Sequence, residues 1–103
     1  MNGPQNLGHW SRLTGKNCFV SCQFMRAGHR YRVVREFDDH DGVLHPVGEE
    51  WTFLSAAFLP HDDGWSWFVS FDGTHEWHIR LQDRPGEQGH VIASLTHYVR
   101  AVT

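Results

Sequence analysis

The stretch FLPHDDGWSWFVSFDG, residues 58–73, decides the fold. After its acidic turn, apolar and polar residues alternate with the period of two that is typical of a β-strand. Trp65, Trp67 and Val69 fall on one face, and serines occupy the other. The tryptophan face is therefore expected to be buried, and we interpret Trp67 as a core residue rather than part of a ligand platform. Phe68 lies on the serine face and is expected to be partly exposed or covered by a helix.

The segments around this stretch predict further strands. HRYRVVREF (29–37), EWTFLSAAFL (50–59) and HEWHIRLQ (75–82) are rich in β-branched and aromatic residues, and the first and last alternate. PHDDG and DGT separate the last three strands and carry turn signals. Segment 43–49 contains Pro46 and Gly48 and is expected to be an extended loop or an edge segment. The order of these elements predicts consecutive antiparallel strands.

The period changes after the breaker DRPG. Apolar residues then recur at helical spacing, which predicts one C-terminal α-helix over about 86–102; they are Val91, Ile92, Leu95, Tyr98, Val99 and Val102. The predicted fold class is mainly β (α+β). By analogy of element order, we expect a four- to five-stranded antiparallel, SH3-like, partly open barrel with this helix at its C-terminus.

Length and composition place limits on domain organisation. A chain of 103 residues supports one domain. Residues 1–27 are rich in Gly, Asn and Pro, which favour loops, so we expect a poorly structured N-terminal extension and a single domain over 28–103. The two cysteines, Cys18 and Cys22, are too few for a disulfide framework. We expect them to be free thiols in a reducing cytoplasm.

Composition also argues against two classes of partner. Only nine residues are Lys or Arg and the formal net charge is −3, whereas nucleic-acid binding requires a clustered basic face. No apolar stretch approaches the roughly 20 residues of a membrane-spanning helix. We therefore expect a cytoplasmic protein that binds neither nucleic acid nor a membrane. Its nine histidines should reverse the sign of the net charge in mild acid.

Four segments together resemble a known family. GHRYRVVREFDDHDG, HPVGEEWTFL, FLPHDDGWSWFVSFDG and WHIRLQDRPGEQG cover most of residues 28–103 in order. They resemble the small bacterial proteins of the domain of unknown function 3601 family. His61 departs from the pattern, since an aromatic residue is more usual there, and residues 1–27 match no known pattern. The resemblance implies domain boundaries and a bacterial origin, and it implies no activity.

Histidines and aspartates in two loops suggest a metal site as an alternative function. The residues His40, Asp41, His45, His61 and Asp63 would meet if segments 38–45 and 61–63 shared one end of a barrel. Zinc needs three or four such ligands within tetrahedral reach. The spacing matches no established zinc motif, and the acidic turn at 37–42 fails the ligand pattern of a calcium loop. We assign no cofactor.

The sequence favours a protein-binding role over catalysis. Ser66 and Ser70 lie on a strand and lack a nucleophile elbow, so we expect no enzyme activity. The preferred partner-binding surface comprises Arg80, Gln82, Arg84 and Gln88 on and after the last strand. The alternative role for Arg80 is an ion pair with Asp63 or Glu50. The expected function is therefore a non-enzymatic interaction module that acts on an unidentified protein partner.

Overall fold

A computed structural model describes residues 1–12 and 18–102, and its architecture is mainly β, as predicted. A seven-stranded antiparallel sheet has the order β1-β10-β9-β8-β5-β11, with β2 paired to β8 as well. Two hairpins, β3–β4 and β6–β7, complete the β structure. The strands are β1 (Asn2–Asn6), β2 (Cys18–Phe19), β3 (Ser21–Cys22), β4 (Met25–Arg26), β5 (Arg30–Val33), β6 (Phe37–Asp38), β7 (Leu44–His45), β8 (Glu50–Leu59), β9 (Gly64–Ser70), β10 (His75–Gln82) and β11 (Val99–Ala101).

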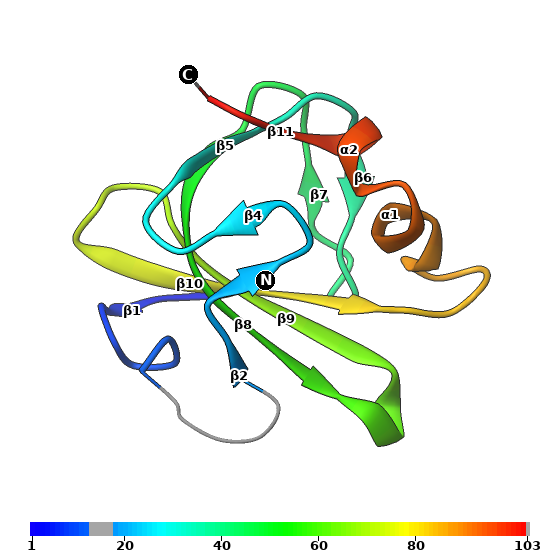
Figure 1. Cartoon of the computed structure of the whole chain (residues 1–103), viewed down its shortest axis with the longest axis horizontal. Coiled ribbons are helices and arrows are strands. Elements are labelled where there is room, and N and C mark those ends of the chain that lie inside the picture. The colour runs from blue at the N-terminus through cyan, green and yellow to red at the C-terminus, as the bar shows by residue number, and fades with distance from the viewer. Residues whose placement is uncertain (13–17, 103) are drawn as a thin grey trace.

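The meander β8–β9–β10 forms the centre of the sheet, and the three long strands cross the molecule side by side (Figure 1). A 3-10 turn, η1 (Pro60–Asp62), joins β8 to β9, and Asp63 completes it in the left-handed region at φ 48°. Gly73 has φ 80° in the next turn. These are the turns that PHDDG and DGT predict. Within the described residues the ladder does not close, since β1 and β11 end it, and the SH3-like topology stays a prediction.

Trp67 lies at the centre of the core, as predicted. It pairs with Ile79 on β10 and Ala56 on β8, and it is 0% exposed. Its ring contacts Trp51 at 6.1 Å and Phe37 at 6.2 Å between centroids. The apolar face read from the alternation is therefore the inner face of the sheet.

The C-terminal region corrects the prediction of one long helix. It contains two short helices, α1 (Gly89–Ala93) and α2 (Leu95–Tyr98), followed by β11. Ser94 separates the helices at φ −127° and ψ 40°, and Val99 is extended. Val99 then pairs with Val33 on β5. The predicted apolar residues from 91 to 99 are buried, but a strand pairing replaces the last helical turns.

The N-terminal region corrects the predicted boundary at residue 28. Strand β1 pairs with β10 and β2 pairs with β8 (Figure 1). Cys22 and Met25 belong to the hydrophobic core, with exposed fractions of 3% and 0%. Edge pairing is made by backbone groups, so it needs no apolar periodicity in the sequence. Part of the predicted extension, residues 13–17, lies outside the described residues.

Phe68 is buried by a segment that the sequence analysis did not consider. Its exposed fraction is 4%. The ring of Trp10 stacks on it at 6.4 Å between centroids, and the ring of His78 lies 4.9 Å away. The outer face of β9 and β10 is thus covered here by the N-terminal segment, whereas we expected partial exposure or a covering helix.

The central position of Trp67 predicts a large loss of stability on truncation. Trp67→Ala should lower the free energy of unfolding by about 3–5 kcal/mol through lost burial and an unfilled cavity. That is a large part of the ~5–15 kcal/mol typical of a domain. Urea denaturation followed by circular dichroism measures it. Val47→Ala, at a residue that is 64% exposed, is the control and should change stability by about 0.5 kcal/mol or less. An unchanged unfolding midpoint for Trp67→Ala would show that Trp67 is not a core residue.

Candidate functional site at the edge of strand β10

Strand β10 has an edge that three separate segments cover. Along its first half, β1 pairs with it from His75 to His78. Farther along, the backbone N–H of His40 donates to the carbonyl of Arg80 at 2.8 Å. At the end of the strand, Gln88 closes the edge: its side-chain Oε1 accepts from the N–H of Gln82 at 2.9 Å, and its own N–H donates to the carbonyl of Gln82 at 2.9 Å. The backbone groups at this edge are therefore paired, and the covering segments lie beside the strand.

A surface cleft of about 560 Å³ lies beside the start of β9 and the end of β10, next to His40 and the turn after β10. We call it the β10 cleft. Three of the four predicted partner-binding residues, Arg80, Gln82 and Arg84, line it. The fourth, Gln88, is 8% exposed and closes the strand edge instead. The lining residues are His40, Leu59, Asp62, Gly64, Trp65, Ser66, Arg80, Leu81, Gln82, Arg84, Pro85 and Glu87.

Part of the lining of the β10 cleft is apolar. Leu59 is 54% exposed at the end of β8. Trp65 packs against Phe58 at 4.9 Å and against Phe19 at 6.0 Å between centroids, which holds its indole in place. Pro85 adds a third apolar surface. An apolar side chain of a partner would lose water contact against these residues.

Two ion pairs hold the cationic side chains of the β10 cleft. Arg80 binds Asp41 through Nε and Nη2, and Arg84 donates from Nε to Asp63 Oδ2 at 3.0 Å. The alternative role considered for Arg80 was an ion pair with Asp63 or Glu50; Arg80 does form an ion pair, but with Asp41, and Glu50 binds Arg32. The hydrogen bonds from Arg80 hold the pKa of Asp41 well below its usual range, even though partial burial opposes the shift. About half of each arginine side chain stays exposed.

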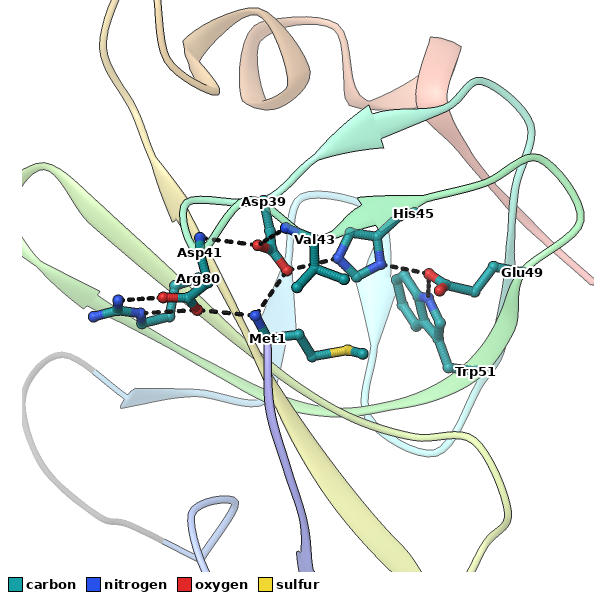
Figure 2. Close-up of polar contacts among 8 residues, drawn as sticks. All are labelled: Met1, Asp39, Asp41, Val43, His45, Glu49, Trp51 and Arg80. Carbon is teal, nitrogen blue, oxygen red and sulfur yellow. Dashed lines mark hydrogen bonds and ion pairs between the residues drawn. The ribbon is translucent and has the colours of Figure 1, made fainter.

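The Arg80–Asp41 pair continues into a buried polar network, which Figure 2 shows. His45 is 0% exposed, and its ring lies between two carboxylates. Its Nε2 is 2.8 Å from Asp39 Oδ2, and its Nδ1 is 2.6 Å from Glu49 Oε2. The N-terminal amine bridges Asp39 and Asp41 at 3.0 and 2.9 Å. A ring with an acceptor at each nitrogen is best satisfied as imidazolium, because both nitrogens then donate.

This network sets the charge state of its members. Burial alone would lower the pKa of His45, but the hydrogen bonds to Glu49 and Asp39 outweigh it, and the net shift is upward. Burial alone would raise the pKa of Asp39, but the contacts with His45 and with the N–H of Val43 outweigh it, and the net shift is downward. The loop between β6 and β8 is thereby held by a buried positive charge between two negative ones.

The residues of the predicted metal site do not converge. His45 is enclosed by Asp39 and Glu49, Asp41 binds Arg80, and Asp63 binds Arg84. Within residues 1–12 and 18–102, no group of three or more His, Cys, Asp or Glu side chains is placed to hold a metal ion. The two loops carry the residue types expected of metal ligands. Most of these side chains instead form ion pairs or hydrogen bonds with neighbouring residues. His40 stays exposed in the β10 cleft.

Two features of the outer face escaped the sequence analysis. Ser66 and His78 form a hydrogen bond of 2.7 Å between Oγ and Nε2. Glu76 is 0% exposed and binds the N-terminal segment, although its place in the alternation indicates only a polar outward position. Desolvation by burial, together with the charge of nearby Arg80, lowers the pKa of His78 to about 4. The Glu76 contact joins segments far apart in sequence, so no residue pattern signals it. Ser66 and His78 lie on adjacent strands of one hairpin, and their shared outer face was the available signal.

Comparison with known proteins places the chain in a family. Residues 12–103 match the model of the family described as Domain of unknown function (DUF3601). The chain belongs to the DUF3601 family. This confirms the resemblance and extends it to residue 12, ahead of the expected start at 28. Among solved structures, the fold is similar to that of an integron cassette protein from the mobile metagenome of Vibrio cholerae, with a TM-score of 0.76 and 30% identity over 81% of this chain and 91% of that chain. No curated protein matches the chain.

The described part of this DUF3601 protein contains no helix with both the length and the apolar composition needed to cross a membrane.

The cysteines Cys18 and Cys22 are free. Burial raises the pKa of the Cys22 thiol to about 11, and a contact with Trp67 only partly offsets this. Cys22 is therefore an unreactive core residue.

The His45 network predicts a pH dependence of stability. Because the folded pKa of His45 lies above its unfolded value of 6.5, the stability it contributes is complete below pH 6.5 and is lost as pH rises through the folded pKa. Asp39 has the opposite sign: its contribution is present above 3.8 and is lost as pH falls through its lower folded pKa. The stabilising effect of the network should therefore be greatest between about pH 4 and 6.5.

The measurement is the difference in free energy of unfolding between the wild type and His45→Gln from pH 5.5 to 9. We expect this difference to shrink as pH rises, by about 1.4 kcal/mol for each unit of pKa shift. His75→Gln is the control, since that ring is 46% exposed. A difference that stays constant across the range, or an NMR titration of His45 below pH 6.5, would contradict the imidazolium assignment.

Proposed function

We propose that this DUF3601 protein is a non-enzymatic interaction module and that the β10 cleft binds a segment of a protein partner. The observation that carries the proposal is the composition of the cleft. Its lining combines two half-exposed arginines, Arg80 and Arg84, and Gln82 with the apolar residues Leu59, Trp65 and Pro85. Arg and aromatic residues are enriched where proteins bind each other, and mixed polar and apolar clefts suit peptide segments.

The ion pairs support this proposal because they restrict the arginines before binding. Asp41 holds Arg80 through two nitrogens, and Asp63 holds Arg84 through one. Side chains already held in place lose less conformational entropy when a partner binds. The cleft also contains Asp62 and Glu87, so a strongly anionic ligand is a poor match. We propose a partner segment with an apolar side chain and hydrogen-bond acceptors, such as backbone carbonyls.

We propose that Ser66 and His78 form a structural pair and not a catalytic one. A serine nucleophile needs a base that accepts its proton and a third group that orients the base. Trp10 and Phe68 flank the His78 ring, at 5.5 and 4.9 Å between centroids, and its pKa of about 4 makes it a weak base at neutral pH. We expect a fluorophosphonate probe to leave the protein unlabelled. Labelling that Ser66→Ala removes would establish a nucleophile and overturn this assignment.

The free cysteines and the arrangement of the strands fit the proposal. The free thiols Cys18 and Cys22 fit a protein of the reducing cytoplasm. The meander β8–β9–β10, flanked by β5, fits an SH3-like, partly open barrel in which loops at the edge carry the binding function. Fold similarity does not assign a function, so the binding proposal rests on the β10 cleft.

The experiment is a quantitative pull-down from host cells with matched variants of the full chain. Arg84→Ala and Leu59→Ala each remove one side chain from the β10 cleft. Arg100→Ala and Val47→Ala remove an arginine and an aliphatic residue at exposed positions outside it. We expect cleft variants to recover the partner roughly tenfold less efficiently, as for loss of ~1.4 kcal/mol of binding free energy. Equal recovery by all four variants, or no partner recovered by the wild type, would contradict the proposal.

A further inference from the structure

The outer face of β9 and β10 carries a second cluster of polar and aromatic contacts, apart from the β10 cleft. Its centre is the carboxylate of Glu76, which is 0% exposed. This carboxylate accepts from the backbone N–H groups of Gly8, Trp10 and Ser11, the last two at 2.8 and 2.9 Å, and from the Ser11 hydroxyl at 2.8 Å. Three of the four donors are backbone groups, so Glu76 recognises the path of a chain rather than its side chains.

An aromatic contact lies beside this carboxylate. The Trp10 ring stacks on Phe68 with an interplanar angle of 14°, and it lies 5.5 Å from the His78 ring. The hydroxyl of Ser55 on β8 donates to the carbonyl of Ser11 at 3.3 Å. Ser55, Phe68, Glu76 and His78 thus form one contact surface, here called the Glu76 groove, for one turn of chain and one aromatic side chain.

The segment before this turn is held at its first residue, where the N-terminal amine pairs with Asp39 and Asp41, and by the backbone pairing of β1 with β10. All five residues of β1 are exposed, and its sequence NGPQN has no apolar side chain. Its pairing with β10 is irregular between Asn2 and Gln5. The contacts of residues 8–11 with the Glu76 groove are therefore the second anchor of the N-terminal segment, besides the ion pairs of its amine.

The residues of the Glu76 groove lie inside the range that matches the family, whereas the segment that occupies it lies outside that range. Residues 55, 68, 76 and 78 lie within the matched range 12–103, whereas residues 1–11 lie outside it. Every hydrogen bond that the described residues give to the Glu76 carboxylate comes from residues 8, 10 and 11. Without them the Glu76 carboxylate would lose these four hydrogen bonds, and the side chain of Phe68 would lose the Trp10 ring that stacks on it.

We propose that the Glu76 groove is a peptide-binding site which this chain fills with its own residues 1–11 and which the same segment of a second copy can occupy in its place. The complementarity is already present in the molecule: a turn with consecutive N–H donors faces a carboxylate, and a tryptophan faces a phenylalanine. A second copy carries the same turn and the same tryptophan. Exchange between copies would therefore replace each contact with an identical one.

The test uses a labelled peptide of residues 1–12, MNGPQNLGHWSR, and the full chain. Trp10→Ala weakens the chain's own segment and leaves the groove intact, so it should bind the peptide roughly tenfold or more tightly than the wild type, in which the internal segment competes. Adding Glu76→Gln to Trp10→Ala should abolish that gain. A peptide with alanine in place of its tryptophan should bind neither protein. Fluorescence anisotropy measures each affinity, and circular dichroism checks folding.

Two further variants keep the result interpretable. Ser11→Ala removes one donor from the segment and should give an intermediate gain in peptide affinity if Trp10→Ala does not fold. Arg84→Ala, combined with Trp10→Ala, should bind the peptide as its parent does, because Arg84 lies in the β10 cleft. The proposed peptide site at Glu76 would be wrong if the wild type and both segment variants bound the peptide with the same affinity. It would also be wrong if the affinity did not depend on Glu76. Either result would leave the β10 cleft proposal standing.

Discussion

The outer edge of β10 is the constraint on which the rest of this structure depends. Within residues 1–12 and 18–102 the sheet does not close, so the outward N–H and C=O groups of this strand need partners, and unpaired edges also invite aggregation. The chain covers the edge with β1, with the N–H of His40 and with Gln88. None of the three continues the meander, and each brings its own side chains to the edge. The surfaces described above follow from this covering.

The same covering segments connect the surface to the core. The loop that offers the His40 N–H also carries Asp41, which binds Arg80, and Asp39, which binds the buried ring of His45. Glu49 closes the far side of that ring and accepts from Trp51 of the core at 3.2 Å. Ion pairs and hydrogen bonds therefore link Arg80 continuously to the core. On the other half of β10, Glu76 holds residues 8–11 in the same way, through a buried charge with several donors.

The sequence predicts those parts of the fold that depend on side-chain periodicity. Alternation around Trp67 predicts the central strands, and PHDDG and DGT predict the turns. Alternation places Arg80 and Gln82 on one face of β10, and Arg84 in the turn after the strand lines the same cleft, whereas binding of a partner there stays a prediction. Backbone partners leave no such pattern, so the edge role of Gln88, the pairing of β1 and the anchoring by Glu76 could not be predicted. The segment Val99–Ala101 fits a helical spacing and a strand equally well, and only pairing with β5 decides between them.

The central claim is that segments covering β10 are separable from the sheet that they cover. Native-state hydrogen exchange tests it most directly, by comparing the amides of Trp10 and Ser11 with those of Trp67 and Ile79 in the β9–β10 ladder. We predict that the first pair exchanges through a local opening of lower free energy, and that Glu76→Gln accelerates this exchange without changing the second pair. If both pairs exchange only with global unfolding, the N-terminal segment is an inseparable part of the fold and the account is contradicted.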